Sequence, residues 1–212
     1  MARAKAADHE EKRAAILQTA ASIFAENGYD AASMRDLASA CGVSKALIYH
    51  YYPSKEMLLS DVIGAHLEAL LSAIETVPAD GDPERRLRMA TSAILDNYDE
   101  ADAEHKLQLN ALSRLPEDEQ KHLRQLQRQI VTRMEQVVHA LAPARLDDEP
   151  ALLRPLTMSL FGMLNWFYLW KRGGGISKEA YADMVADLFI GGMERAIREE
   201  STADTSDKVR NA

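Results

Sequence analysis

Residues 33–52 read SMRDLASACGVSKALIYHYY, and this stretch decides the fold expected for the first part of the chain. Ala38, Gly42 and Ile48 stand at the spacing of two short helices that cross next to a tight turn. The first helix needs a small residue such as Ala38 where the second helix comes close. The turn needs a residue with positive φ, which glycine adopts at little cost. The stretch therefore predicts a helix-turn-helix.

The same spacing divides the second short helix, residues 44–52, into a buried and an exposed face. Ile48 and Tyr52 are four positions apart and face inward together. We expect them to close a small core with Leu37, Val43 and Phe24. The residues left outside offer donors and a cation suited to the edge of a DNA duplex: Ser44, Lys45, Ala46, Tyr49 and His50. Such a motif can also serve packing alone, so the spacing by itself leaves both uses open.

Proline and glycine signals divide the chain into helical segments, and no run alternates as a half-buried strand does. The fold class predicted is all-α. The expected organisation is a helix-turn-helix domain at 1–53, a helical ligand-binding and dimerisation domain at 54–200 that begins with a connecting helix at 54–77, and a disordered tail at 201–212. The helices are expected at about 9–27, 33–40, 44–52, 54–77, 83–100, 102–114, 116–141, 150–171 and 177–199.

Composition predicts a folded globular protein, because 47% of the 212 residues are apolar and 27% are charged. The single cysteine, Cys41, suits a reducing compartment and is more typical of a packing thiol than of a redox sensor. No apolar run of membrane-spanning length and no signal peptide is recognisable, so we expect a cytoplasmic protein without a membrane partner. The net charge of −8 comes from residues 61–212, because positive and negative side chains are equal in number in residues 1–60. A nucleic-acid face is therefore expected in the first 60 residues.

The segment MRDLASACGVSKALIYHYYPSKEMLL, residues 34–59, resembles the DNA-binding region of the TetR family of bacterial transcriptional regulators. The resemblance covers about residues 12–62. The rest of the chain agrees with that family in its length and its helical pattern.

By this resemblance, several side chains are expected at the DNA. Lys45, Ala46 and Leu47 stand where the family reads base edges. Leu47 favours a methyl contact with thymine. Because Ala46 offers no donor, Lys45 is the strong base-reading donor, and we expect DNA shape to contribute to sequence recognition. The expected DNA-binding residues are Ser33 and Arg35 at the helix that touches the backbone, Ser44, Lys45, Ala46 and Leu47 at the bases, and Tyr49, His50, Tyr51 and Lys55 at phosphates.

Dimerisation is expected because two helix-turn-helix units one helical turn apart read a palindrome. The last two long helices carry apolar stripes with small residues, which serve an interface or an ordinary core equally well. Resemblance to the four-helix dimer bundle of the family favours the interface. The stripes comprise Met158, Phe161, Gly162 and Asn165, and Tyr181, Met184, Leu188, Phe189 and Gly192.

An effector pocket is suggested by the aromatic segment LTMSLFGMLNWFYLWK at 156–171, although core packing explains the same composition. This segment is similar to TetR-type regulators of fatty-acid, steroid or aromatic catabolism, which implies a hydrophobic or acyl-CoA effector. The expected lining residues are Met89, Leu112, Met134, Phe161, Asn165 and Trp166. Candidate partners for a coenzyme A phosphate are Arg85, Arg86 and Arg88, or Lys121, Arg124 and Arg128.

The resulting expectation is a homodimeric repressor that leaves a palindromic operator when an effector binds. The first alternative is a ligand-independent or architectural DNA-binding protein. The second is an all-α enzyme, which is disfavoured because no nucleophile with a base, no phosphate-binding loop and no metal-ligand spacing is evident. His50 and His66 lack a second ligand four residues on. No cofactor, metal or catalytic residue is expected.

Overall fold

The computed structural model describes residues 2–167 and 175–210. Helices account for all the regular structure in those ranges, which confirms the all-α prediction. In chain order the elements are α1 (Ala2–Asn27), α2 (Met34–Ala40), α3 (Lys45–Tyr51), α4 (Lys55–Glu75), α5 (Pro83–Glu100), α6 (Asp102–Asn110), η1 (Leu112–Arg114), α7 (Glu117–His139), α8 (Pro143–Asp148), η2 (Pro150–Leu152), α9 (Leu153–Asn165) and α11 (Lys178–Arg210).

The chain forms two compact units. Unit 1 contains residues 1–69 and 100–128, and unit 2 contains residues 70–99 and 129–212. The long helices α4 and α7 each contribute to both units, so the units are not continuous in sequence. The expected division between residues 53 and 54 marks the end of the helix-turn-helix in the sequence. The two compact units instead reflect the packing of the long helices. The functional division into domains stays a prediction.

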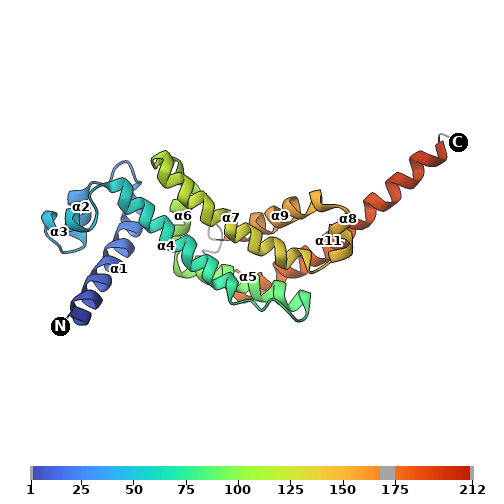
Figure 1. The fold of residues 1–212 in the computed structure, drawn as a ribbon, viewed down its shortest axis with the longest axis horizontal. Coiled ribbons are helices and arrows are strands. Elements are labelled where there is room, and N and C mark those ends of the chain that lie inside the picture. Colours follow the sequence, from blue (N-terminus) through green and yellow to red (C-terminus); the bar gives the residue numbers. More distant parts are fainter. Residues whose placement is uncertain (1, 168–174, 211–212) are drawn as a thin grey trace. The chain divides into compact units, whose positions relative to one another are not determined.

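Unit 1 begins with the three helices α1, α2 and α3, of which α2 and α3 lie side by side (Figure 1). Their shared core is the one expected from the sequence except at Val43, which is half-buried. Leu37 and Ile48 are fully buried, and Ala38, Tyr52 and Phe24 are buried with them. Burial of this apolar surface stabilises the crossing of two helices that are each only seven residues long.

The turn between α2 and α3 is closed by hydrogen bonds that require a glycine. Gly42 has a φ of +64°. The Val43 amide donates to the Ala38 carbonyl at 3.0 Å, and the Gly42 amide donates to the Ser39 carbonyl at 3.1 Å. This pair of bonds is the Schellman arrangement, which satisfies the last carbonyls of a helix and reverses the chain. The prediction of a positive φ at this position is confirmed.

Serine side chains begin both helices of the motif. The Ser33 hydroxyl accepts from the Asp36 amide at 3.2 Å, and the Asp36 carboxylate accepts from the Ser33 amide at 3.3 Å, so α2 starts with a capping box. The hydrogen bonds from Ser33 hold the pKa of Asp36 below its usual value. The Ser44 hydroxyl accepts from the Leu47 amide at 3.1 Å and caps α3.

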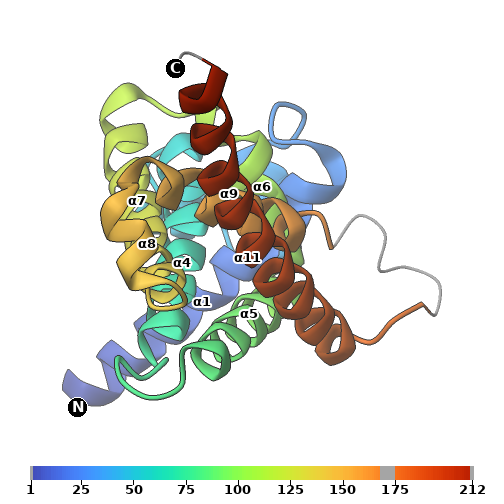
Figure 2. The ribbon, with the colours of Figure 1, turned by 90° about the vertical axis from the view of Figure 1, so that its right-hand side faces the viewer.

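Unit 2 is built from α5, α8, α9, α11 and the remaining parts of α4 and α7. Helices α5 and α11 lie next to each other (Figure 2), joined by ion pairs from Arg88 to Asp187 at 2.5 Å and from Lys178 to Asp96 at 2.6 Å. The Tyr181 hydroxyl of α11 donates to the Met163 carbonyl of α9 at 2.7 Å. These contacts orient α11 against its two neighbours.

Several helix boundaries differ from those expected. Helix α1 begins at Ala2 rather than near residue 9. The short helices η1 and η2 occupy the ends of segments expected as longer helices, and α8 lies between two expected helices, where none is expected. Helix α11 continues through Arg210, where a disordered tail is expected, and no proline or glycine follows Gly192 to end it. Residues 168–171 of the aromatic segment lie outside the described residues.

Helix α4 is long and apolar enough to cross a membrane by length and composition, with a mean hydropathy of 1.5 over 18 residues. More than half of that window is buried inside the protein. Leu58, Leu59, Ile63 and Leu67 are each fully buried. Such burial is typical of a core helix, and it accounts for the apolar character of α4.

We expect two glycine-to-alanine substitutions in unit 1 to have opposite effects on stability. Gly42→Ala places a side chain at a φ of +64° and should lower the free energy of unfolding by about 1 kcal/mol. Gly64→Ala lies inside α4, where the new Cβ would be 3.6 Å from Leu123 Cδ2, an ordinary contact. It should raise that free energy by roughly 0.5–1 kcal/mol because glycine weakens a helix interior. Urea unfolding measures both values, and equal signs would contradict this account of the turn.

Candidate DNA-binding surface

The outward face of α3 is the candidate site. Ser44, Lys45, Ala46, Tyr49 and His50 are all exposed, as the helical spacing predicts. Ile48, on the opposite face, is fully buried and anchors the helix to the core of unit 1. A seven-residue helix held by one face therefore presents its other face to solvent. This is the geometry that a helix needs to enter a major groove.

Lys45 carries the positive charge at the start of this face. Its ammonium nitrogen lies 5.7 Å from the centre of the Tyr49 ring, a cation–π contact along one side of the helix. Leu47 is half-buried, so part of its side chain reaches solvent beside Lys45 and Ala46. The face therefore offers the cation of Lys45 and the apolar side chain of Leu47 at the start of α3. The hydroxyl of Tyr49 and the imidazole of His50 follow.

The two serines expected at DNA also cap helices. The Ser33 hydroxyl donates to the Asp36 carboxylate at 2.5 Å, and Ser44 accepts from the Leu47 amide. The Ser44 hydroxyl proton stays available for a phosphate or base, whereas the Ser33 hydroxyl proton is used within α2. Arg35 is exposed on α2.

Tyr51 links α3 to the first helix. Its ring lies 4.6 Å from the ring of His9 in α1 and 5.8 Å from the ring of His50, measured between ring centres. The side chain is half-buried. Tyr51 can therefore support the end of the reading face and still present its hydroxyl at the edge.

Lys55 has an internal role that the sequence did not indicate. Its ammonium group donates to the carbonyls of Tyr29 at 2.8 Å and Ala32 at 3.0 Å. It also lies 4.3 Å from the centre of the Tyr29 ring. These contacts tie the start of α4 to the loop between α1 and α2, and one of the three ammonium protons is left for a phosphate.

An ion pair missed by sequence reasoning fixes α1 against α4. Arg13 Nη2 donates to Asp61 Oδ2 at 2.6 Å. Tyr52, which ends α3, is buried next to them, and its burial together with the charge of Asp61 raises its pKa. Arg13 and Asp61 are 48 positions apart, so no local spacing could have signalled the pair. The arrangement ties α1 and α4 together beside the end of the reading helix.

The residues expected to line an effector pocket are placed in different surroundings. Met134 and Phe161 are buried in unit 2, whereas Met89 and Trp166 are exposed, Trp166 by 56%. Leu112 belongs to unit 1. Asn165 is half-buried and accepts a hydrogen bond from the Tyr98 hydroxyl at 2.8 Å. The pocket therefore stays a prediction.

The arginines and lysine considered for a coenzyme A phosphate mostly have partners within the protein. Arg86 is buried and donates to the Pro78 carbonyl at 2.9 Å. Arg88 pairs with Asp187, and Lys121 pairs with Glu117 and Asp118 on α7. Arg124 donates to Gln120, while Arg85 and Arg128 are exposed. Binding a phosphate at the paired groups would have to replace these contacts.

Residues 2–167 and 175–210 contain no group of three or more His, Cys, Asp or Glu side chains arranged to hold a metal ion. Cys41 is half-buried at the end of α2, and burial raises the pKa of its thiol, which disfavours the reactive thiolate.

We expect Lys55→Met to lower the free energy of unfolding by about 2 kcal/mol, because two carbonyls lose a charged donor and Tyr29 loses a cation. The control is Lys121→Met, whose ion pairs are exposed and which should cost less than about 0.5 kcal/mol. Urea unfolding at one protein concentration gives both values. Equal losses for the two variants would refute the internal role of Lys55.

Two family models match the chain. The model described as "Bacterial regulatory proteins, tetR family" matches residues 16–62, and the "Tetracyclin repressor-like, C-terminal domain" matches residues 80–193. The second match alone includes more than half of the chain.

Curated relatives are transcriptional regulators. The transcriptional repressor KstR2 of Rhodococcus jostii is 31% identical over 112 residues, which include 53% of this chain and 52% of KstR2. The transcriptional activator FasR of Mycolicibacterium smegmatis is 34% identical over 88 residues, 41% of this chain and 40% of FasR. These matches span about half of each relative or less.

Solved structures agree over a larger share of the chain. A TetR-family regulator from Bordetella parapertussis is 34% identical with a TM-score of 0.77, and the match includes 84% of this chain and 93% of that one. AibR, solved in complex with isovaleryl coenzyme A and operator DNA, is 27% identical with a TM-score of 0.71 over 84% of this chain and 98% of AibR. The chain belongs to the TetR family of bacterial transcriptional regulators.

Proposed function

We propose that this protein is a cytoplasmic repressor that binds a palindromic operator as a homodimer and leaves it when a hydrophobic or acyl-CoA effector binds. The observation that carries the DNA-binding part is the exposed face of α3, with Lys45, Tyr49 and His50 outside and Ile48 fully buried. Lys45 reads base edges, helped by Leu47. Phosphate contacts come from the hydroxyls and cations around this face.

The operator is found by selecting duplexes from a randomised pool with the purified protein. We expect the selected sequences to be palindromic and their affinity to fall as salt rises, because phosphate contacts release counterions. Lys45→Ala should weaken binding to the selected duplex by about 1–3 kcal/mol, roughly 5- to 150-fold, and relax preference at the base it contacts.

Lys121→Ala is the matched control, because it removes an exposed lysine from α7 without touching α3. Its affinity should stay within about twofold of the parent protein. Equal losses for Lys45→Ala and Lys121→Ala would mean that the face of α3 is not the reading surface.

The dimer is proposed from an exposed apolar surface on unit 2. Met158 on α9 is 48% exposed and Trp166, directly after α9, is 56% exposed. Met184 and Leu188 on α11 are 39% and 59% exposed. Gly162, Gly191 and Gly192 are also exposed, and they allow a second helix to approach closely. Phe161, Tyr181 and Phe189 are buried, so the inner part of the expected stripes serves the core of this unit.

We expect the parent protein to sediment at twice 23.6 kDa and Leu188→Glu to shift it toward the monomer, because a carboxylate would be buried in the interface. Met57→Glu makes the same kind of change on α4, where Met57 is 45% exposed, and should leave the dimer intact. A parent protein that stays monomeric at micromolar concentration would overturn the dimer.

The acyl-CoA effector class is supported by AibR, which was solved with isovaleryl coenzyme A, and the repressor role is supported by KstR2, which is named as a repressor. Within unit 2, Met134 and Phe161 are buried side chains that an apolar group would contact if the core opened. Titrating the selected duplex with and without isovaleryl or palmitoyl coenzyme A tests release. An unchanged affinity with every acyl-CoA would favour the alternative, a ligand-independent DNA-binding protein.

A further inference from the structure

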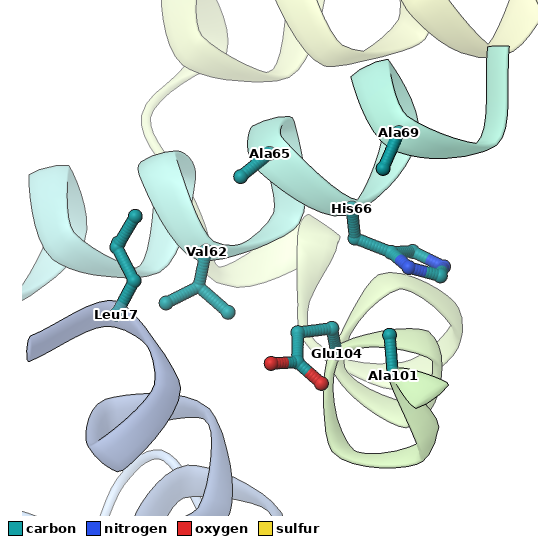
Figure 3. Close-up of a pocket in the computed structure, with 7 residues that line it drawn as sticks. All are labelled: Leu17, Val62, Ala65, His66, Ala69, Ala101 and Glu104. Atoms are coloured by element: carbon teal, nitrogen blue, oxygen red, sulfur yellow. The ribbon is translucent and has the colours of Figure 1, made fainter. Parts of the chain in front are cut away.

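A cavity of about 200 Å³ lies within unit 1, between α1, α4 and the start of α6. Figure 3 shows the side chains around it, with Leu17 from α1, Val62, Ala65, His66 and Ala69 from α4, and Ala101 and Glu104 at the start of α6. None of the residues expected to line an effector pocket belongs to it. The lining residues are Leu17, Val62, Ala65, His66, Ala69, Ala101 and Glu104.

Small side chains create the space. Ala65 and Ala69 stand one turn apart on α4, and Ala101 precedes α6. About 200 Å³ would hold roughly six or seven water molecules at about 30 Å³ each. That is less than the volume of most drug-sized ligand sites. The cavity therefore suits a compact organic molecule of about seven non-hydrogen atoms rather than an acyl-CoA.

Glu104 gives this mostly apolar cavity a negative charge without a counter-ion. In the described ranges, no lysine or arginine is paired with its carboxylate, and Lys106 pairs with Asp102 at 2.8 Å instead. Burial, and then the charge of Asp102, raise the pKa of Glu104. A carboxylate in such surroundings is stabilised by a bound cation more than an exposed carboxylate would be.

His66 supplies the second polar group and no positive charge. It is 3% exposed, and its ring centre lies 5.7 Å from that of His105. Burial, and then the neighbouring His105, lower the pKa of His66 to about 3, so its ring is neutral at pH 7. Glu104 is the one acidic side chain among the lining residues, so the cavity offers a carboxyl group and no cation to a ligand.

We propose that this cavity is a binding site for a small organic ammonium ion, with the ammonium group on Glu104 and the apolar part against Leu17, Val62 and the alanines. The site is distinct from the effector pocket expected in the C-terminal part. It lies in the unit that contains the helix-turn-helix.

The site also gives a route to regulation, and this part rests on the proposed DNA-binding function. Helix α1 contributes Leu17 to the cavity, and its residues Ile16, Ala20 and Phe24 are buried in unit 1, which also contains α2 and α3. A ligand that favours one position of α1 would shift the reading helix to the extent that α1 and α3 move together. If the two sites are coupled, the bound ammonium ion changes the affinity for the operator by some factor. By linkage, the bound operator then changes the affinity for the ammonium ion by the same factor.

The binding test uses cyclohexylamine as the probe and cyclohexanol as its uncharged counterpart, with calorimetry at pH 7 on the full chain in phosphate buffer free of Tris. We expect cyclohexylamine to bind at least about tenfold more tightly than cyclohexanol. Glu104→Gln should remove that preference, and Ala65→Leu should weaken both probes at least about tenfold by filling the cavity. Ala65 is exposed at the rim, so the larger side chain need not disturb the core.

The matched control is Glu68→Gln, which removes an exposed carboxylate from α4 outside the cavity and should bind both probes as the parent does. Equal affinity for the two probes, or a preference that survives Glu104→Gln, would overturn the ammonium site. Cyclohexylamine binding is measured without DNA, so a failure of the proposed DNA-binding function would leave this result standing.

The regulatory part is tested by titrating the selected duplex in saturating cyclohexylamine and in its absence. We expect the affinities to differ at least about threefold for the parent and for Glu68→Gln, and to coincide for Glu104→Gln. Identical affinities in the parent protein, with cyclohexylamine bound, would overturn the coupling.

Discussion

The reversal of the chain at Gly42 is the constraint on which the DNA-reading surface depends. Two seven-residue helices are too short to be stable alone, and they are held because the amides of Gly42 and Val43 satisfy the last carbonyls of α2 while Ile48 is buried against Leu37. This reversal determines which side of α3 faces the core. The exposure of Lys45 and His50 follows from it.

Long-range contacts then fix α3 within unit 1. The end of the helix packs through Tyr52 beside the Arg13–Asp61 pair and through Tyr51 against His9. Helix α1 is common to these contacts, to the core beneath the motif and to the cavity at Glu104. A change in the position of α1 would therefore reach the reading surface directly.

Sequence reasoning predicted the elements set by local chemistry. The positive φ of Gly42 and the exposed face of α3 both depend on residues within about ten positions of each other. It did not predict the internal bonds of Lys55, because its carbonyl partners lie 23 and 26 positions away and carry no side-chain signal. The position of an effector pocket could not be predicted from the sequence either, because a core and a pocket wall have the same aromatic composition.

Amide hydrogen exchange of the full chain, with and without the selected duplex, reports which residues meet the DNA. We expect DNA to slow exchange across residues 44–51, where α3 meets the groove, with smaller changes at the start of α2. Unchanged exchange in residues 44–51 while the duplex is bound would contradict this expectation, because the protein would then be reading DNA with another surface.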